Sequence, residues 1–277
     1  MIGSLVERAL YGLRRQKLSQ DIAWSLGSFA VLAISGIVIN IVITALRDAA
    51  ALGVFNIAYA VYIIASQFAV WGMHYSVLRH AAYYADDAGE RGRMLMTAVA
   101  CTLAMGLVAA AVVAAGEPLF AWAFSSQTTG GAIRNAACGL LLFPVNKVLL
   151  AYLNGLRLMK AYSIIQAARY LMLMALVSGL AASSLPIETT SFGFLLAELG
   201  TALLVVAYLT KCRLAQALSF SLEWRNRHFR FGTKGLMAGM FAEVNSRVDV
   251  LMIGFFLSDR ATGIYSFAAM LVDGLYH

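Results

Sequence analysis

The sequence has little charge, little proline and few cysteines, and each shortage argues against a class of protein. Charged residues make up 13% of the 277 positions, whereas a soluble domain has about 25%. The three prolines suit long helices better than an all-β barrel. The three cysteines, Cys101, Cys138 and Cys212, form no CxxC pair or Cys/His cluster. The sequence therefore indicates neither a zinc site nor a disulfide framework.

Long apolar runs take the place of charge. The chain is 61% hydrophobic and its mean hydropathy is +0.77. The runs are continuous rather than alternating, which favours helices over barrel strands. We therefore predict an all-α polytopic membrane protein. Its spans are expected at residues 24–45, 54–78, 94–115, 136–154, 161–182, 191–210 and 235–257, with an eighth beginning near residue 261.

The order of these spans predicts four regions. Residues 1–23 are basic and amphipathic, and we expect a helix lying on the cytoplasmic leaflet. Residues 24–210 would form one complete six-helix bundle, and residues 211–234 a basic cytoplasmic linker. Residues 235–277 would begin a second bundle of which one to two helices are present. Because the last residues are still apolar, we expect a fragment or a truncated reading frame.

Lysine and arginine lie mostly on one side of the predicted spans. With the N-terminus inside, 15 of the 21 fall in inside segments, and only Arg47, Arg134 and Arg260 fall outside. The positive-inside rule therefore predicts a cytoplasmic N-terminus. The net charge of +7 is then a topology signal rather than a nucleic-acid site.

One predicted span, GLMAGMFAEVNSRVDVLMIGFFL, carries three ionisable side chains near its centre. An ionisable group at that depth costs roughly 2.5–3.5 kcal/mol on insertion scales, so this span must face a partner helix or a hydrated cavity. Glu243 and Arg247 are four residues apart in the favourable order, and we expect them to neutralise one another. Asp249 points elsewhere and needs a partner on another helix. The chain is thus a candidate for moving something polar across a membrane.

Lys147 lies in the middle of the fourth span, on one helical face with Phe143, Ala151 and Asn154. It is either a cavity cation for a phosphate or sugar acid, or a structural lysine. We favour the cavity cation because a central position makes snorkelling to the interface difficult.

Arg169 lies on a polar stripe with Tyr162, Gln166 and Tyr170. It could bind phosphate oxygens through two hydrogen bonds or pair with Glu198, and the sequence leaves both open. Glu198 could carry a proton if it were buried without a cation, but we favour a fixed salt bridge.

Several other polar residues in the spans are interpreted as helix-packing groups rather than ligands. They are Asn40, Thr44 and Arg47 in the first span and Gln67, Trp71 and His74 in the second.

Two short segments indicate an internal repeat. Gly53-Val54-Phe55 with Ala58 is similar to Gly263-Ile264-Tyr265 with Ala268, at a constant offset of 210 positions. Six predicted spans separate the copies, so both cross the membrane in the same direction. That is the parallel type of repeat.

The stretch RFGTKGLMAGMFAEVNSRVDVLMIGFFLSDRATGIYSFAAML resembles the opening of the second half of the multidrug/oligosaccharidyl-lipid/polysaccharide exporter superfamily. NSRVD, followed by an apolar run, a short turn and GIYSFA, is most similar to the polysaccharide (O-antigen type) flippases. The first half agrees, with ALRDAAALGVFNIAYAV and WGMHYSVLRHAA resembling the family's first hairpin. Members have two bundles of six helices, and this chain departs from them by stopping in its eighth.

The resemblance implies a V-shaped pair of bundles around a cavity that opens alternately to each side. The substrate would be a lipid-linked oligosaccharide, moved across the bacterial cytoplasmic membrane, with polysaccharide assembly proteins as further partners. Its anionic pyrophosphate would contact cavity cations, for which the candidates are Lys147, Arg169 and Arg247. Ion-coupled members use acidic residues in the same spans, so H⁺ or Na⁺ coupling, or a structural ion pair, would involve Glu198, Glu243, Asp249 and Asp273. No other cofactor is expected.

Other functions remain open at this point. Within the superfamily they are a cation-coupled multidrug exporter and a lipid II flippase, and a non-transporting fragment is a further possibility. A membrane glycosyltransferase, polymerase or phosphatidyltransferase would need a carboxylate cluster for metal or a large catalytic outer loop. The largest predicted outer loop, residues 116–135, holds only Glu117 and Arg134 as charged residues. We therefore predict that the chain is not an enzyme.

Overall fold

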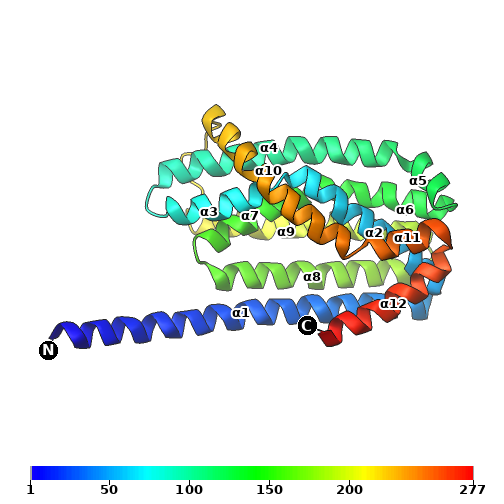
Figure 1. Cartoon of the computed structure of the whole chain (residues 1–277), viewed down its shortest axis with the longest axis horizontal. Helices are drawn as coiled ribbons and strands as arrows, with labels where there is room; N and C mark the ends of the chain where they lie inside the picture. Colours follow the sequence, from blue (N-terminus) through cyan, green and yellow to red (C-terminus); the bar gives the residue numbers. More distant parts are fainter. Residues whose placement is uncertain (1, 277) are drawn as a thin grey trace.

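The computed structural model describes the backbone of residues 2–276 and the side chains of residues 17–270. Throughout this part the chain is helical and has no strand. The helices follow one another along the molecule, as Figure 1 shows. Their bounds are α1 Ile2–Leu46, α2 Ala49–Val70, α3 Met73–Tyr83, α4 Ala88–Ala115, α5 Glu117–Ala123, α6 Gln127–Ala137, α7 Phe143–Gly155, α8 Met159–Ala182, α9 Phe192–Lys211, α10 Leu222–Asn245, α11 Val248–Phe256 and α12 Asp259–Tyr276, with short 3₁₀ turns η1 Cys138–Leu141 and η2 Ile187–Ser191.

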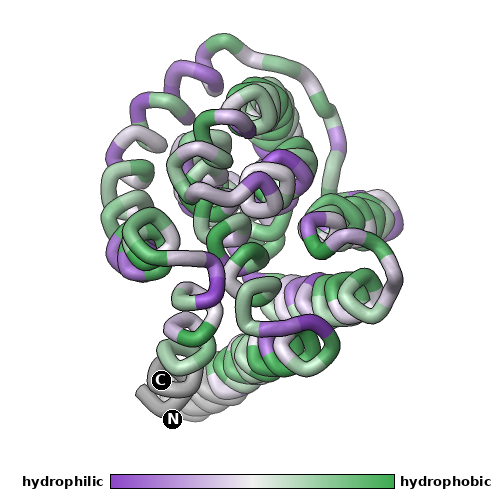
Figure 2. The backbone as a smooth tube through the Cα atoms, turned by 90° about the vertical axis from the view of Figure 1, so that its right-hand side faces the viewer, coloured by the Kyte–Doolittle hydropathy of each residue, from purple (hydrophilic) through white to green (hydrophobic). Residues whose placement is uncertain are grey.

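Five of the described helical segments are long and apolar enough to cross a bilayer, and a sixth is formed if the bent pair at residues 127–155 counts as one span. Viewed from the end that carries α5 and α6, the tube is largely hydrophobic along the helices (Figure 2). The chain is a multi-pass helical membrane protein, as its composition predicted.

The predicted helix boundaries need four corrections. The first helix runs through residue 23 without a break, because no glycine or proline lies between Gly12 and Gly27. The second span is divided after Val70, where Trp71 and Gly72 both adopt left-handed backbone angles. The fourth is divided before α7 and bends by 42°. Pro144, in the first turn of α7, has no N–H to continue the preceding helix.

The span predicted at residues 235–257 is also two helices, α10 and α11, separated at Ser246 and Arg247. Short polar side chains at this break bond to backbone groups and compete with the regular helical pattern. Ser246 Oγ donates to the carbonyl of Ala242 at 2.9 Å, and Asp249 Oδ1 accepts from the N–H of Val250 at 2.8 Å.

Two buried apolar clusters hold the helices together. One lies where α2, α6 and η1 meet, and the other where α3, α4 and α7 meet the start of α10. The first includes Ile43, Leu52, Ile57, Ile133 and Leu140. The second includes Met73, Val77, Met94, Leu153 and Trp224.

The two similar segments found in the sequence contact one another. A Cβ added to Gly53 of α2 would lie 1.7 Å from the carbonyl oxygen of Asp259, and one added to Gly263 of α12 would lie 1.8 Å from that of Ala49. Asn56 Nδ2 donates to Ser266 Oγ at 2.8 Å.

All three pairs of equivalent positions in this contact are 210 residues apart, so the contact is nearly two-fold symmetric. We call it the α2–α12 seam. Its glycines are needed because the two backbones approach too closely for any side chain.

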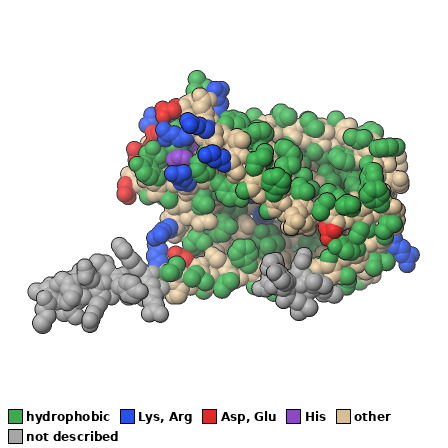
Figure 3. All heavy atoms as spheres, viewed as in Figure 1, with side chains coloured by type: hydrophobic (Ala, Val, Ile, Leu, Met, Phe, Trp, Pro, Cys, Tyr) green, Lys and Arg blue, Asp and Glu red, His purple; other side chains and the backbone are tan. Residues whose placement is uncertain are grey.

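Lysine and arginine gather at one end of the visible face, near the starts of α4 and α10, while hydrophobic side chains cover most of the rest (Figure 3). At that end Arg227 Nη1 donates to the Tyr84 hydroxyl at 3.3 Å. Two of the basic segments that the sequence groups on one side of the membrane, residues 79–93 and 211–234, therefore meet in space.

Candidate functional site

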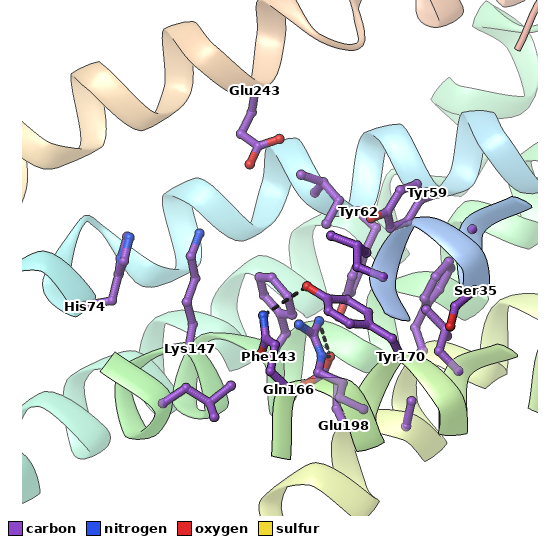
Figure 4. Close-up of a pocket in the computed structure, with 18 of the residues that line it drawn as sticks. Ser35, Tyr59, Tyr62, His74, Phe143, Lys147, Gln166, Tyr170, Glu198 and Glu243 are labelled. Carbon is purple, nitrogen blue, oxygen red and sulfur yellow. Dashed lines mark hydrogen bonds and ion pairs between the residues drawn. The ribbon is translucent and has the colours of Figure 1, made fainter. Parts of the chain in front are cut away.

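A cavity of about 520 Å³ lies between α1, α2, α7, α8 and α9, with α3 and α10 along its edge. Figure 4 shows tyrosine, amide and charged side chains converging on it from these helices. Gln166 Nε2 donates to the Tyr170 hydroxyl at 2.9 Å within its wall. The cavity thus carries polar groups in its wall although its helices are apolar overall.

Lys147 projects into the cavity from α7 with the neighbours that its helical spacing predicted. Phe143, Ala151 and Asn154 line the same cavity, which confirms the shared face. Its Nζ lies 5.8 Å from the centre of the Phe143 ring. Among the described side chains, none forms a salt bridge with it.

Arg169 forms a salt bridge with Glu198, the second of the two alternatives left by the sequence. Its Nη2 lies 2.6 Å from Glu198 Oε1, and the Glu198 side chain is only 2% exposed. Asn146 Nδ2 donates to the other carboxylate oxygen at 2.7 Å. The Arg169 guanidinium also lies 4.7 Å from the centre of the Phe143 ring. Both oxygens of Glu198 are therefore occupied by donors.

Glu243 and Arg247 form the i,i+4 pair that the sequence predicted, with Arg247 Nε 3.3 Å from Glu243 Oε2. Arg247 lies at the break between α10 and α11, and its guanidinium is 4.8 Å from the centre of the Tyr59 ring. Both residues line the cavity. In Figure 4, Glu243 points down from α10 toward the same space as Lys147.

Asp249 is not among the cavity residues. Its Oδ2 accepts a hydrogen bond from Tyr265 of α12, so the predicted partner on another helix is present. The side chain of Asp273 lies outside the described residues.

The positive and negative charges that line the cavity are unequal in number. Lys147, Arg169 and Arg247 face Glu198 and Glu243, and the two arginines each pair with one carboxylate. The surplus positive charge is on Lys147. The site therefore combines two internal ion pairs with one cation available to a ligand.

A protein-family model described as polysaccharide biosynthesis protein matches residues 42–276. The chain belongs to this family. The resemblance inferred from its second half is thereby confirmed. No curated protein sequence matches the chain.

Solved structures of similar fold agree with this family. A MOP superfamily transporter from Pyrococcus furiosus, described with a binding pocket of reverse polarity, has a TM-score of 0.63 at 16% identity, covering 92% of this chain and 64% of that one. A MATE protein in complex with MaD5 has a TM-score of 0.64 at 14% identity, with 90% and 64% covered. The MATE multidrug transporter DinF-BH has a TM-score of 0.65 at 13% identity, with 92% and 60% covered. The chain thus spans about three-fifths of the length of these structures, and the likeness is one of fold.

In this member of the polysaccharide biosynthesis protein family, sequence reasoning missed the aromatic wall of the cavity. Asn56, Tyr59, Tyr62 and Ile63 of α2 all line it. Their spacing of three, six and seven residues puts them on one helical face, and that spacing could have revealed them.

His74 was interpreted as a packing group, but it lines the cavity. Its ring lies 3.9 Å from that of Tyr75, and its Nδ1 has no hydrogen-bond partner among the described residues. Trp71 does pack between helices, since its Nε1 donates to Thr233 Oγ1 at 3.2 Å. Arg47 also has a structural position, because its guanidinium donates to the carbonyls of Ala181, Ser183 and Leu185 at the end of α8.

Proposed function

We propose that this family member is a transporter that moves a lipid-linked oligosaccharide across the bacterial cytoplasmic membrane by alternating access, with its N-terminus inside. The observation that carries the proposal is the unpaired Lys147 in a cavity that already neutralises its two arginines. An ionisable group at this depth is costly unless it serves a ligand or a partner. A phosphate or pyrophosphate would satisfy it.

The rest of the lining suits a sugar next to that phosphate. Tyr59 and Tyr170 offer flat rings that can pack against a pyranose, and Asn40 and Gln166 offer amides for its hydroxyls. These groups come from α1, α2 and α8. We infer that the phosphate lies near Lys147 and the first sugars near the tyrosines.

Ion coupling, if present, falls to Glu243 rather than Glu198. Glu198 is 2% exposed and bonded through both oxygens, whereas Glu243 is 32% exposed and makes a longer contact of 3.3 Å. A group that exchanges H⁺ or Na⁺ needs access to water and a partner that can release it. Glu198 then keeps α7, α8 and α9 together.

A second candidate is a cation-coupled multidrug exporter. Its support is the fold shared with MATE multidrug transporters and the presence of two carboxylates, Glu198 and Glu243, in the cavity. The two candidates differ in the sign of charge that the cavity prefers. The family and its similar folds support either transport role over the catalytic alternatives.

Binding of two lipophilic ions to the purified chain distinguishes the candidates. We expect Lys147→Ala to weaken binding of a polyprenyl pyrophosphate at least about tenfold, since a charge-assisted hydrogen bond contributes roughly 1.5–3 kcal/mol. The same change should strengthen binding of the cation tetraphenylphosphonium. Lys147→Arg keeps the charge and is the matched control for the anion. Unchanged pyrophosphate binding in Lys147→Ala would contradict the proposal, and preferential cation binding by the unmodified chain would favour the exporter.

A further inference from the structure

A second recess, of about 490 Å³, lies where α1, the α7–α8 turn and the end of α9 meet. Its walls come from three separate segments. They are Lys17, Gln20, Asp21 and Trp24 of α1, residues 157–161 of the turn, and Tyr208 of α9. It shares no residue with the central cavity.

The recess carries an excess of positive charge. Lys17, Arg157 and Lys160 face a single carboxylate, Asp21. None of these four side chains takes part in a salt bridge in the described part of the chain. The Lys160 Nζ instead lies 5.4 Å from the centre of the Trp24 ring, which is within range of a cation–π interaction. Within the described residues, three cations are thus gathered around one carboxylate and outside any salt bridge.

Arg157 occupies a backbone position that disfavours it. Its φ is +57°, a left-handed conformation usually taken by glycine at the end of a helix. The turn is well fixed, since the N–H of Leu158 bonds to the carbonyl of Leu153 at 3.0 Å. A non-glycine residue in this region costs on the order of 1 kcal/mol. The arginine held here at that cost is one of the residues that line the recess.

The recess lies where the headgroups of a membrane leaflet would be. Trp24 begins the first predicted span, and tryptophan and tyrosine mark the membrane–water interface, so Trp24 and Tyr208 place the recess at that level. Beside it α1 exposes Leu18, Ile22 and Leu26 by 60%, 50% and 63%. A ligand with a phosphate in the recess could therefore lay hydrocarbon chains along α1.

From these observations we propose that the recess binds the phosphate headgroup of an anionic phospholipid of the leaflet in which the chain's basic segments lie. The three cations contact the phosphate oxygens, and Trp24 and Tyr208 flank the glycerol. Basic pockets between membrane helices are a general way of recognising such headgroups. The bound lipid would join α1 to α8 and α9 without entering the central cavity.

Native mass spectrometry of the full chain, with phosphatidylglycerol and phosphatidylcholine added in equal amounts, tests the proposal. We expect the triple variant K17Q/R157Q/K160Q to lose phosphatidylglycerol binding at least about tenfold, because each basic group near a membrane surface contributes roughly 1 kcal/mol. The charge-conserving variant K17R/R157K/K160R should retain binding. Phosphatidylcholine adducts should not change in either variant.

The matched control R225Q/R230Q/K234Q removes three exposed cations of α10, a helix that does not line the recess. An equal loss of phosphatidylglycerol in this control would overturn the proposal, since net charge alone would then explain binding. Displacement of the lipid by inorganic phosphate at an equimolar concentration would also overturn it, because the acyl chains would then contribute nothing. Circular dichroism of each variant verifies that the helices are intact.

Arg157→Gly gives an independent readout. Glycine removes the cost of the left-handed backbone, so the variant should unfold at the same temperature or higher. Its phosphatidylglycerol affinity should nevertheless fall about threefold or more, since one of the three basic groups is lost. Undiminished lipid binding in Arg157→Gly would show that the arginine is only part of the turn.

Discussion

The helices that follow residue 221 meet the preceding ones at two places of contrasting chemistry. At the α2–α12 seam, Gly53 and Gly263 each face a backbone carbonyl, and Asp259 accepts from the hydroxyls of Ser126 and Thr129 at 2.6 and 2.8 Å. These groups are small, and the carboxylate is partly exposed. The two places lie at opposite ends of the molecule (Figure 1).

The second place, which we call the α3–α10 joint, also brings two glycines together. A Cβ on Gly72 would lie 2.2 Å from the carbonyl oxygen of Gly232. Around it, however, the side chains are large and buried: His228 Nδ1 lies 2.8 Å from Ser76 Oγ, and Trp224 Nε1 donates to Glu90 Oε1 at 2.8 Å. Trp224 is 2% exposed and His228 is fully buried.

The difference in buried side chains indicates which of the two contacts can open. Opening the α2–α12 seam exchanges hydroxyl–carboxylate bonds for bonds to water, which changes the free energy little. Opening the α3–α10 joint would expose a tryptophan, whose burial alone contributes several kcal/mol at about 25 cal/mol per Å². We therefore expect the seam to separate, and the joint to stay closed, in the transport cycle that we propose.

The largest changes in stability should come from adding one methyl group at each of the two contacts. Gly72→Ala and Gly53→Ala should each lower the free energy of unfolding by about 3 kcal/mol, because overpacking forces backbones apart. Gly72→Ala should be the more damaging, since its φ of +63° adds backbone strain. Thermal unfolding in detergent measures both.

Gly36→Ala is the control for these variants, since nothing lies within 4 Å of a Cβ added there. It should stabilise the helix by about 0.5–1 kcal/mol. An unfolding temperature for Gly53→Ala equal to that of Gly36→Ala would mean that the seam is not tightly packed.

Acid should weaken the joint. Burial lowers the pKa of His228, in the basic segment outside the predicted span, from 6.5 to about 4, with the nearby His80 and Arg227 acting in the same direction and a hydrogen bond to the Met94 carbonyl opposing them. Between these pH values the unfolded chain binds a proton that the folded chain does not, so stability falls as pH decreases. The loss should be about 2 kcal/mol at pH 5.

His228→Gln has no titrating ring and should flatten this dependence between pH 7 and pH 5. Unfolding temperatures of the two proteins across that range test the assignment. A parallel decline in both would place the acid-sensitive group elsewhere, for example at the half-exposed His80.

Trp224→Phe should destabilise the joint by about 1.5–2 kcal/mol, because it leaves Glu90 without the indole donor in a partly buried site. Trp122→Phe is the matched control, since Trp122 is 73% exposed. Denaturant unfolding of both variants gives the difference. Equal stability of the two would mean that the indole hydrogen bond is not needed.

The smallest loss of stability is expected when the carboxylate of the seam is replaced. Asp259→Asn keeps the shape and one acceptor oxygen, so it should cost only about 1 kcal/mol. It should also make residues 126 and 259 separate more often, which a spin-label or cross-linking measurement would detect. Asp86→Asn, in an exposed turn, should change neither quantity. A larger stability loss in Asp259→Asn than in Trp224→Phe would reverse the comparison.

Much of this architecture follows from local signals in the sequence. The spans, the common side of the basic segments and the Lys147 face depend on hydropathy and spacing along one helix. Glu243 and Arg247 are four residues apart, so their pairing was predictable. The break at Ser246 and Arg247 was not, because it depends on which of several polar side chains bonds to the backbone.

Contacts between helices were harder to predict. The sequence placed Arg169 and Glu198 on adjacent helices but could not choose between a salt bridge and a ligand, since helix rotation decides which groups meet. The spacing of Tyr59 and Tyr62 places them on one face of α2, but it does not say whether that face lines a cavity or packs against a helix. The offset of 210 positions identified the two copies, but only the structure reveals that the copies touch.

The contact between the two copies at the α2–α12 seam has a consequence for the evolutionary origin of the chain. A nearly two-fold contact between positions 210 residues apart is the contact that two molecules of a shorter ancestral protein would make as a homodimer. Duplication and fusion of its gene would place both partners on one polypeptide, so Gly53 and Gly263 would descend from a single glycine that once met its own counterpart in a sister molecule.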